Sequence, residues 1–462
     1  MHRTLSNRIF PNRIASFQGF IACLALVACS PLYAQSPPQP VKLSPLKLSL
    51  DDAIQRGLKA NLGVLERQSA DRMVRADRIR ALSSLLPTVN AYAAENVQKN
   101  NIAVFGFRFP GIPTIIGPFG YSDVRATAEA NLFDQKARKN WQASAKNIQA
   151  AELNTQDAKD LVVQAVANAY LAILADAARV DSTKVEVTTA QALYERARDQ
   201  HAAGVSPAID ELRSQVELKS RQQQLLADQN RFGKDKLTLQ QVIGLPGAQD
   251  IELTDTAPYS PLANLTPEQL NERARTSRAD YQSLKVQLEA AQLSRDAALA
   301  GRYPVLAVNG NYGYDGVNAS QSRGTFQFAG EVKVNVFDGG RIRADVLQAD
   351  SLIQQRKDEM ADLERHMDTD IRSALLDLQS AADQVDVAES NLNLANETLT
   401  QARDRFAAGV TDNIEVVQAQ DSVAGAQDNL IASRYAHNLA KVALARAIGM
   451  TETNLKQFIG GK

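Results

Sequence analysis

Two long stretches of the sequence keep a regular spacing of small and apolar residues. Residues 121–203 and 341–408 contain neither glycine nor proline, so each is expected to include a continuous helix. In both, the spacing alternates between four and three residues. This mean period of 3.5 predicts left-handed coiled coils. The seam positions are Val162, Val166, Ala169, Ile173, Asp176, Val180, Thr183, Val187, Ala190, Tyr194, Ala197 and His201 in the first stretch, and Met367, Ile371, Ala374, Leu378, Ala381, Val385, Ala388, Leu392, Ala395, Leu399, Ala402 and Phe406 in the second.

Each long helix is expected to turn back at a glycine. Gly204-Val205 and Gly409-Val410 end the two stretches, and returning helices are predicted over residues 208–243 and 413–448. The result is two antiparallel helical hairpins, each about 100 Å long at 1.5 Å per residue. Asp134 and Asp338 lie just before the long helices, where a carboxylate accepts hydrogen bonds from free amides, so both are predicted N-caps.

A second pattern has a period of two residues. Apolar side chains alternate with polar ones over 124–132 and 326–336, and strands near 88–95 and 305–314 complete two β-hairpins. Segments with one apolar and one polar face suit the wall of an outer-membrane barrel. A soluble, half-buried sheet has the same alternation. Four strands are too few to close a barrel around a passage, so the barrel interpretation requires several chains.

The whole order of elements occurs twice. Ala197-Arg-Asp-x-x-Ala-Ala-Gly-Val205 recurs 205 residues later, and Asn131-Leu-Phe-Asp134 recurs as Asn335-Val-Phe-Asp338. Each unit begins with a predicted helix, over residues 50–85 and 267–302, and Leu86-Pro87 corresponds to Tyr303-Pro304. A period of about 200 residues is far longer than that of ordinary solenoids. The predicted organisation is a first repeat over 45–243, a proline-containing linker over 244–266, a second repeat over 267–449, and a C-terminal tail over 450–462.

The N-terminus has the features of an export signal. Three arginines precede about ten apolar residues, a length typical of a secretory signal and too short to span a bilayer. Leu26-Val27-Ala28-Cys29 is typical of a bacterial lipobox, which makes residues 1–28 the signal peptide and Cys29 a lipidated N-terminus. Cleavage after residue 34, at Leu32-Tyr33-Ala34, is the alternative.

Composition limits the chemistry. The 51 basic and 52 acidic side chains nearly balance, which argues against nucleic-acid binding. The two cysteines both precede residue 30, which excludes a disulfide framework, and the four histidines offer no metal-ligand spacing. His201 is expected to pack or face solvent. With no nucleotide-binding loop and no catalytic constellation, the sequence predicts a protein without a cofactor that is not an enzyme.

These features together resemble the TolC-like outer membrane efflux protein family. The resemblance rests on the duplicated order, the two Pro-containing helix ends, the Phe133-Asp134 and Phe337-Asp338 strand exits, and the two Ala-Ala-Gly-Val tips. It implies a mixed, mainly helical fold with a membrane β-barrel part, in which a homotrimer closes twelve strands in outer-membrane lipid and continues them as a helical periplasmic tunnel. The implied partners are a periplasmic adaptor, facing Gly204, Val205, Gly409 and Val410, and an inner-membrane pump of the RND, ABC or MFS type.

The resemblance also implies an aperture. Asp210 and Glu415 each lie six residues after a tip glycine, so three chains would form acidic rings there. A solvated charge beside a helix start is the alternative. The functions in view are a passive exit duct for small molecules in a tripartite efflux pump, the outer-membrane part of a type I protein secretion system, or a periplasmic coiled-coil scaffold that never inserts.

Overall fold

The structure is a computed structural model that describes residues 44–106, 110–247, 249–255, 259–260, 266–318, 320–411 and 413–451. The predicted signal peptide, Cys29 and the alternative cleavage site lie outside the described residues, as does most of the predicted tail. The described residues form one unit, and it contains the same order of elements twice.

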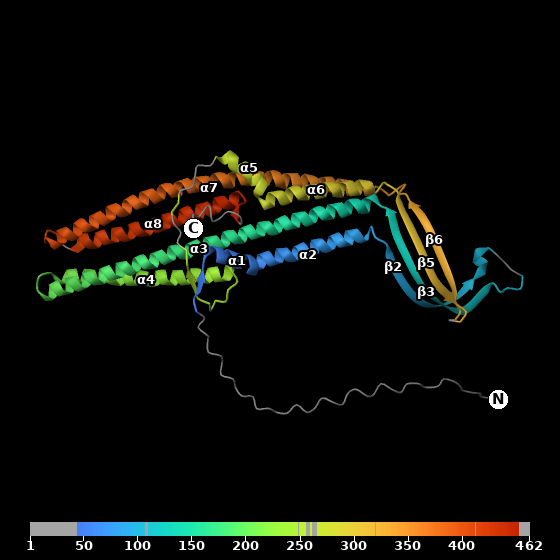
Figure 1. The fold of residues 1–462 in the computed structure, drawn as a ribbon, viewed down its shortest axis with the longest axis horizontal. Coiled ribbons are helices and arrows are strands. Elements are labelled where there is room, and N and C mark those ends of the chain that lie inside the picture. The colour runs from blue at the N-terminus through green and yellow to red at the C-terminus, as the bar shows by residue number, and fades with distance from the viewer. Residues whose placement is uncertain are drawn as a thin grey trace, which may run out of the picture. The chain divides into compact units, whose positions relative to one another are not determined.

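The two helical hairpins form as predicted. The first pairs α3 (Gln135–Ala202) with α4 (Ala208–Val242), and the second pairs α7 (Arg341–Ala407) with α8 (Asn413–Ala447). The hairpins lie side by side, with α3 against α8 (Figure 1). The long helices α3 and α7 are continuous over 68 and 67 residues, as the lack of glycine and proline predicts.

The predicted seams are the buried sides of the long helices. In α7, nine of the twelve seam residues are buried, and Leu378, Leu392 and Phe406 are partly buried. In α3 the seam is buried or partly buried up to Ala197, and His201 is exposed. Alanine recurs on both seams, which allows close approach of neighbouring helices. The period of 3.5 residues is thus confirmed as a packing pattern.

The first helix of each repeat is broken, and the expectation of one continuous helix was wrong. The first repeat has α1 (Leu50–Ala60) and α2 (Leu62–Ser83), and the second has α5 (Pro267–Ser277) and α6 (Ala279–Ala300). Asn61 and Arg278, at the breaks, have extended backbone. The Asn61 side chain accepts a hydrogen bond from the Gly63 amide at 2.9 Å, and so caps α2.

Each break is tied to the end of a returning helix. Asn61 Nδ2 donates to the carbonyl of Val242 at 3.4 Å, and Arg278 Nη1 donates to that of Ala447 at 3.4 Å. The glycine that follows each returning helix leaves room for the contact: a Cβ on Gly449 would lie 2.7 Å from the Arg278 backbone. The two repeats therefore use one device, in which an extended residue supplies a donor to an otherwise free helix carbonyl.

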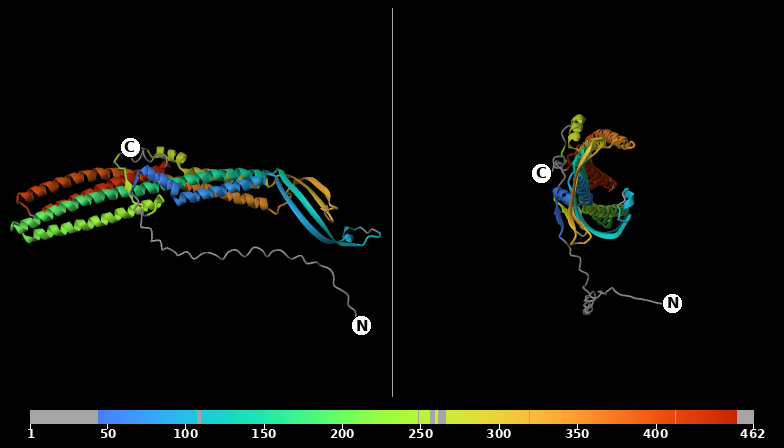
Figure 2. Two further views of the ribbon diagram at one scale, coloured as in Figure 1. Left: turned by 60° about the horizontal axis from the view of Figure 1, so that its bottom comes forward. Right: turned by 90° about the vertical axis from the view of Figure 1, so that its right-hand side faces the viewer.

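The four long strands form one antiparallel sheet in the order β2-β3-β5-β6. In Figure 2 the sheet is bent into an arc. Its outer strands, β2 and β6, are edges, so the sheet stays open within one chain. The strands are longer than predicted, except that β6 stops before Val334 and Val336, which were expected to belong to it. The bounds are β2 (Thr88–Asn101), β3 (Ile115–Phe133), β5 (Val305–Gly316) and β6 (Arg323–Lys333), with a short 3-10 helix, η1 (Ile102–Phe105), after β2.

The register places apolar side chains on one face of the sheet. Ala126 of β3 lies opposite Tyr312 of β5, which in turn lies opposite Phe326 of β6. On the other face, Arg125 lies opposite Tyr92 and Gly313. Large apolar side chains on the first face are exposed, Phe326 by 79%. The alternation predicted from the sequence is therefore present, and none of the described residues covers its apolar side.

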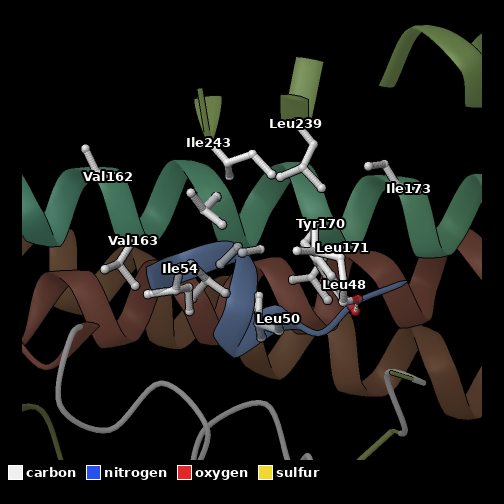
Figure 3. Packing of buried hydrophobic residues seen from close by; sticks show 14 of the residues in the cluster. Leu48, Leu50, Ile54, Val162, Val163, Tyr170, Leu171, Ile173, Leu239 and Ile243 are labelled. Carbon is white, nitrogen blue, oxygen red and sulfur yellow. Dashed lines mark hydrogen bonds between the residues drawn. The ribbon is translucent and has the colours of Figure 1, made fainter. Parts of the chain in front are cut away.

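A small parallel sheet joins the start of the first repeat to the predicted linker. Strand β1 (Leu46–Leu48) pairs with β4 (Ile251–Leu253), an element that the sequence analysis did not predict. Both strands pack on the main core beside α1, α3 and α4 (Figure 3). Tyr170 is fully buried there and donates its hydroxyl to the carbonyl of Leu48 at 3.0 Å. By length and composition, α3 is apolar enough to cross a membrane. Apolar residues of α3 contribute to this core.

Candidate functional site at the hairpin tips

The two hairpin tips have the same local geometry. Gly204 and Gly409 both have a φ of +71°, a left-handed conformation that favours glycine. The amides of Val205 and Val410 then donate back to carbonyls of the helices that have just ended, at 2.9 and 3.0 Å. Both valine side chains are largely exposed, by 75% and 69%. Each tip therefore presents an apolar side chain on a fixed turn, and the turn itself lies where the repeated motif predicts it.

The two acidic residues behind the tips differ in their surroundings. Asp210, in the first turn of α4, is 9% exposed, and Arg213 Nη1 lies 3.8 Å from its carboxylate. Glu415, in the first turn of α8, is partly buried, and Arg405 Nη1 lies 3.5 Å from its carboxylate. Each acid is thus close to an arginine from its own hairpin. Such a pair lowers the net charge that the acid contributes.

One side chain joins the two tips. Asn413 begins α8, is 1% exposed, and donates its Nδ2 to the carbonyl of Asp210 at 3.1 Å. Its Oδ1 has no hydrogen-bond partner among the residues that the structure describes. The Ser214 hydroxyl also donates to the Asp210 carbonyl. Asp210 and the start of α8 are therefore held together within one chain, a contact that the sequence analysis missed because no local pattern indicates it.

Further contacts join the two hairpins. The guanidinium of Arg196 lies over the Phe406 ring, 5.8 Å from its centroid. Farther from the tip, Arg221 of α4 contacts Glu217 of its own helix at 2.6 Å, Glu186 of α3 at 3.2 Å, and Asp421 of α8. Burial raises the pKa of Glu186. Arg221 is thus an ionic link between the first hairpin and the second.

The histidine near the first tip makes a hairpin contact. His201 Nδ1 lies 2.7 Å from Glu211 Oε2, and the ring is exposed. The described residues contain no group of three or more histidine, cysteine or acidic side chains placed to hold a metal ion. His201 therefore bridges α3 and α4 across the turn.

The strand exits also carry their predicted caps, with one difference. Asp134 directly precedes α3, and its carboxylate accepts from the Ala137 amide at 2.9 Å. Asp338 is not the N-cap residue of α7, because two left-handed glycines follow it and Gly340 takes that position. Its carboxylate still accepts from the Gly340 and Ile342 amides, at 3.0 and 2.8 Å. These amides lower the pKa of Asp338.

A sheet with exposed apolar side chains, carried on two long helical hairpins, is the fold of an outer-membrane channel. The Campylobacter jejuni CmeC outer membrane channel has this fold, with a TM-score of 0.74 and 16% identity over 89% of this chain and 89% of that chain. The chain belongs to the outer membrane efflux protein family, whose model matches residues 65–245 and 270–450. The two matches correspond to the two repeats described above.

Curated relatives agree with this assignment. The pyoverdine export outer membrane protein OpmQ of Pseudomonas aeruginosa is 23% identical over 433 residues, which cover 87% of this chain and 85% of OpmQ. The outer membrane protein OprJ of the same organism is 26% identical over 437 residues, with 87% of this chain and 82% of OprJ covered. The protein is therefore an outer-membrane component of an efflux system.

Proposed function

We propose that three copies of the chain close into a ring that forms the passive exit duct of a tripartite pump exporting small molecules. In this ring, twelve strands make a barrel in the outer membrane, and the long helices continue it as a tunnel. A periplasmic adaptor meets the hairpin tips, and an inner-membrane pump supplies the energy. The proposal rests on the two outer sides of the chain, which we call its flanks. Each flank consists of outer helices with exposed apolar side chains and an edge strand, as expected for one half of an interface.

Exposed apolar side chains collect on the helices at the flanks. Along the hairpins, α3 and α8 lie in the middle, while α4 and α7 lie outside; beside the sheet, α2 and α7 are outermost (Figure 1). One flank of each chain would thus meet the opposite flank of the next, which is the arrangement that closes a ring. The exposed apolar side chains are Leu62, Leu65, Met73 and Ile79 on α2, Ile209, Leu212, Val216, Leu226 and Leu237 on α4, and Leu347, Leu352, Leu376, Val387 and Leu394 on α7.

The single observation that carries the proposal concerns distance from the hairpin tips. Two of these side chains on one flank lie at the same distances from a tip glycine as two on the other flank. Leu226 lies 22 residues after Gly204, and Val387 lies 22 residues before Gly409. Leu237 and Leu376 each lie 33 residues from the same glycines. All four are more than half exposed. An interval of 11 residues is about three helical turns, so each pair shares one face of its helix. Helix α4 of one copy and α7 of the next would bring the two pairs together.

The strands support the same arrangement. The edges β2 and β6 present unpaired backbone groups, which in a membrane must be satisfied by another strand. The exposed apolar face of the sheet fits lipid, and the polar face fits a water-filled interior. Lipidation of Cys29, if processing occurs at the lipobox, would add an anchor in the same membrane.

In this ring Asp210 and Glu415 are the aperture residues. The bond from Asn413 to the Asp210 carbonyl and the two acid–arginine pairs hold the tips of one chain together. Opening the tunnel requires the two hairpins to separate at this point. Gly204, Val205, Gly409 and Val410 are the adaptor-facing residues, since their turns present the exposed valines.

Cross-linking tests the ring. A chain carrying both Leu226→Cys and Val387→Cys is expected to give covalent dimers and trimers with a short bismaleimide in isolated outer membranes. The matched control is Leu226→Cys with Leu376→Cys. The distances of these two positions from their tip glycines differ by 11 residues, which is about 16 Å along a helix. The single variants, which still carry Cys29, give the background. Equal cross-linking of the matched and mismatched pairs, or monomers alone from both, would overturn the proposed interface.

A further inference from the structure

An arginine on the polar face of the sheet crosses from one repeat to the other. Arg125 of β3 donates from Nη1 to Asn311 Oδ1 of β5 at 2.6 Å, and from Nη2 to Thr325 Oγ1 of β6 at 3.2 Å. Its side chain is 18% exposed, although it lies on an open sheet. The side chain therefore lies flat across β5 and connects the first β-hairpin with the second.

Two carboxylates accompany this arginine. Arg125 Nε donates to Asp123 at 3.2 Å, and Asp315 lies 4.0 Å from Nη2. The Thr325 hydroxyl, which accepts from Arg125, donates to Asp315 at 2.9 Å. The Tyr92 hydroxyl donates to Asp123 at 3.0 Å. All four strands thus contribute to one polar cluster around a single guanidinium.

Gly313 provides the space for this crossing. It lies directly opposite Arg125 in the register, and a Cβ there would lie 2.8 Å from the Arg125 Cβ and 2.6 Å from the Val124 carbonyl. No larger residue fits without displacing backbone. The cluster lies near the turn between β5 and β6, because Asp315 is one residue from the last residue of β5 and Thr325 is two residues from the first residue of β6. Arg125 is eight residues, or about 25 Å along the strand, from the last residue of β3, where the helices begin.

We propose that Arg125 sets the charge selectivity of the barrel interior by pairing with Asp123 and Asp315 and offsetting one of their two negative charges. This inference rests on the proposed channel, since it requires the polar face to line the passage. Another cation, Arg323, lies opposite Asp315 in the register, but its side chain is exposed and forms no ion pair in the described part of the chain. Without Arg125, three chains would expose six carboxylates at one level, and such rings favour cations.

Reversal potentials in planar bilayers test this inference. The background is a trimer with Asp210→Asn and Glu415→Gln, so that the aperture contributes no acidic side chain. Under a gradient of 10 to 100 mM KCl, where screening on the dilute side extends about 30 Å, Arg125→Gln is expected to raise the ratio of potassium to chloride permeability about twofold or more. Arg125→Lys keeps the charge and is expected to leave the ratio close to that of the background.

Two controls separate the possible outcomes. Arg273→Gln removes one exposed positive charge from α5, away from the sheet, and is expected to change nothing. If Arg125→Gln does not assemble, Asp315→Asn is expected to lower the permeability ratio instead. A conducting Arg125→Gln or Asp315→Asn pore with an unchanged ratio would overturn the role of Arg125 and leave the channel intact. A background trimer that forms no pore would contradict the proposed function itself.

Discussion

At the scale of single residues, Lys441 has the least expected position. It lies on α8 with no exposed surface, and its ammonium donates to the carbonyl of Ser260. The residues described by the structure provide it with no ion-pair partner within 4 Å. Burial lowers the pKa of Lys441 to about 8. One turn away, burial and the charge of Lys441 lower the pKa of His437 to about 4, and its ring packs on Tyr259 at 4.8 Å.

The buried lysine should make stability depend on pH. Between pH 8 and 10.5, the ordinary lysine value, the unfolded chain binds more protons at this position than the folded chain. The free energy of unfolding therefore rises with pH across this window. Lys441→Met is expected to remove this part of the slope and to raise stability at pH 7 by about 1–3 kcal/mol. Urea unfolding in detergent, followed by circular dichroism, measures both effects.

The exposed Lys357 on α7 supplies the control for this experiment. Lys357→Met should shift stability by less than about 0.5 kcal/mol, since surface changes rarely do more. If the free energy of unfolding has the same slope between pH 8 and 10.5 in Lys441→Met and in the unchanged protein, the buried ammonium does not cause this pH dependence.

Sequence patterns predicted some residues of the candidate site and not others. The tip glycines, Asp134, Asp210 and Glu415 were identifiable because a repeated motif or a position next to a helix start marks them. Asn413 was not, because its role depends on a carbonyl 203 residues away. Arg125 was visible as a polar position in an alternating strand, yet its partners on β5 and β6 follow only from strand order and register.

At the scale of elements, local rules gave the long helices and failed at the helix breaks. A stretch without glycine or proline, with a constant heptad, forms a helix because it lacks the two strongest breakers and can bury one face along its whole length. Arg278 also favours a helix, but its backbone is extended. The reason is tertiary: its guanidinium donates to the end of α8, contacts Asp280 at 2.6 Å, and lies 3.6 Å from Asp370. Packing thus overrides propensity at this residue.

Arg278 is therefore expected to contribute more to stability than its place between two short helices suggests. Its side chain is 7% exposed, so Arg278→Ala would leave the partly buried Asp280 without this partner and free the Ala447 carbonyl. We expect a loss of about 3 kcal/mol in the free energy of unfolding. Arg273→Ala, on the exposed side of the neighbouring helix, should cost less than about 0.5 kcal/mol. Similar urea midpoints for the two variants would show that the break does not depend on Arg278.

At the scale of the whole molecule, the chain buries its main core in its middle and is incomplete at its flanks. The core lies where α1, α3, α4 and the β1–β4 pair meet, while the sheet has two open edges and the outer helices carry exposed apolar side chains. The sequence alone indicates this incompleteness, because four amphipathic strands cannot close a ring. Which flank meets which could not be predicted without the spatial order of the helices.

The measurement that tests the central claim most directly is the conductance of the purified trimer in a planar bilayer. The account predicts discrete, long-lived current steps, and larger steps for the variant with Asp210→Asn and Glu415→Gln, because neutral side chains remove the ion pairs with Arg213 and Arg405 at the aperture. A folded, trimeric preparation of this variant that leaves the bilayer insulating would contradict the account.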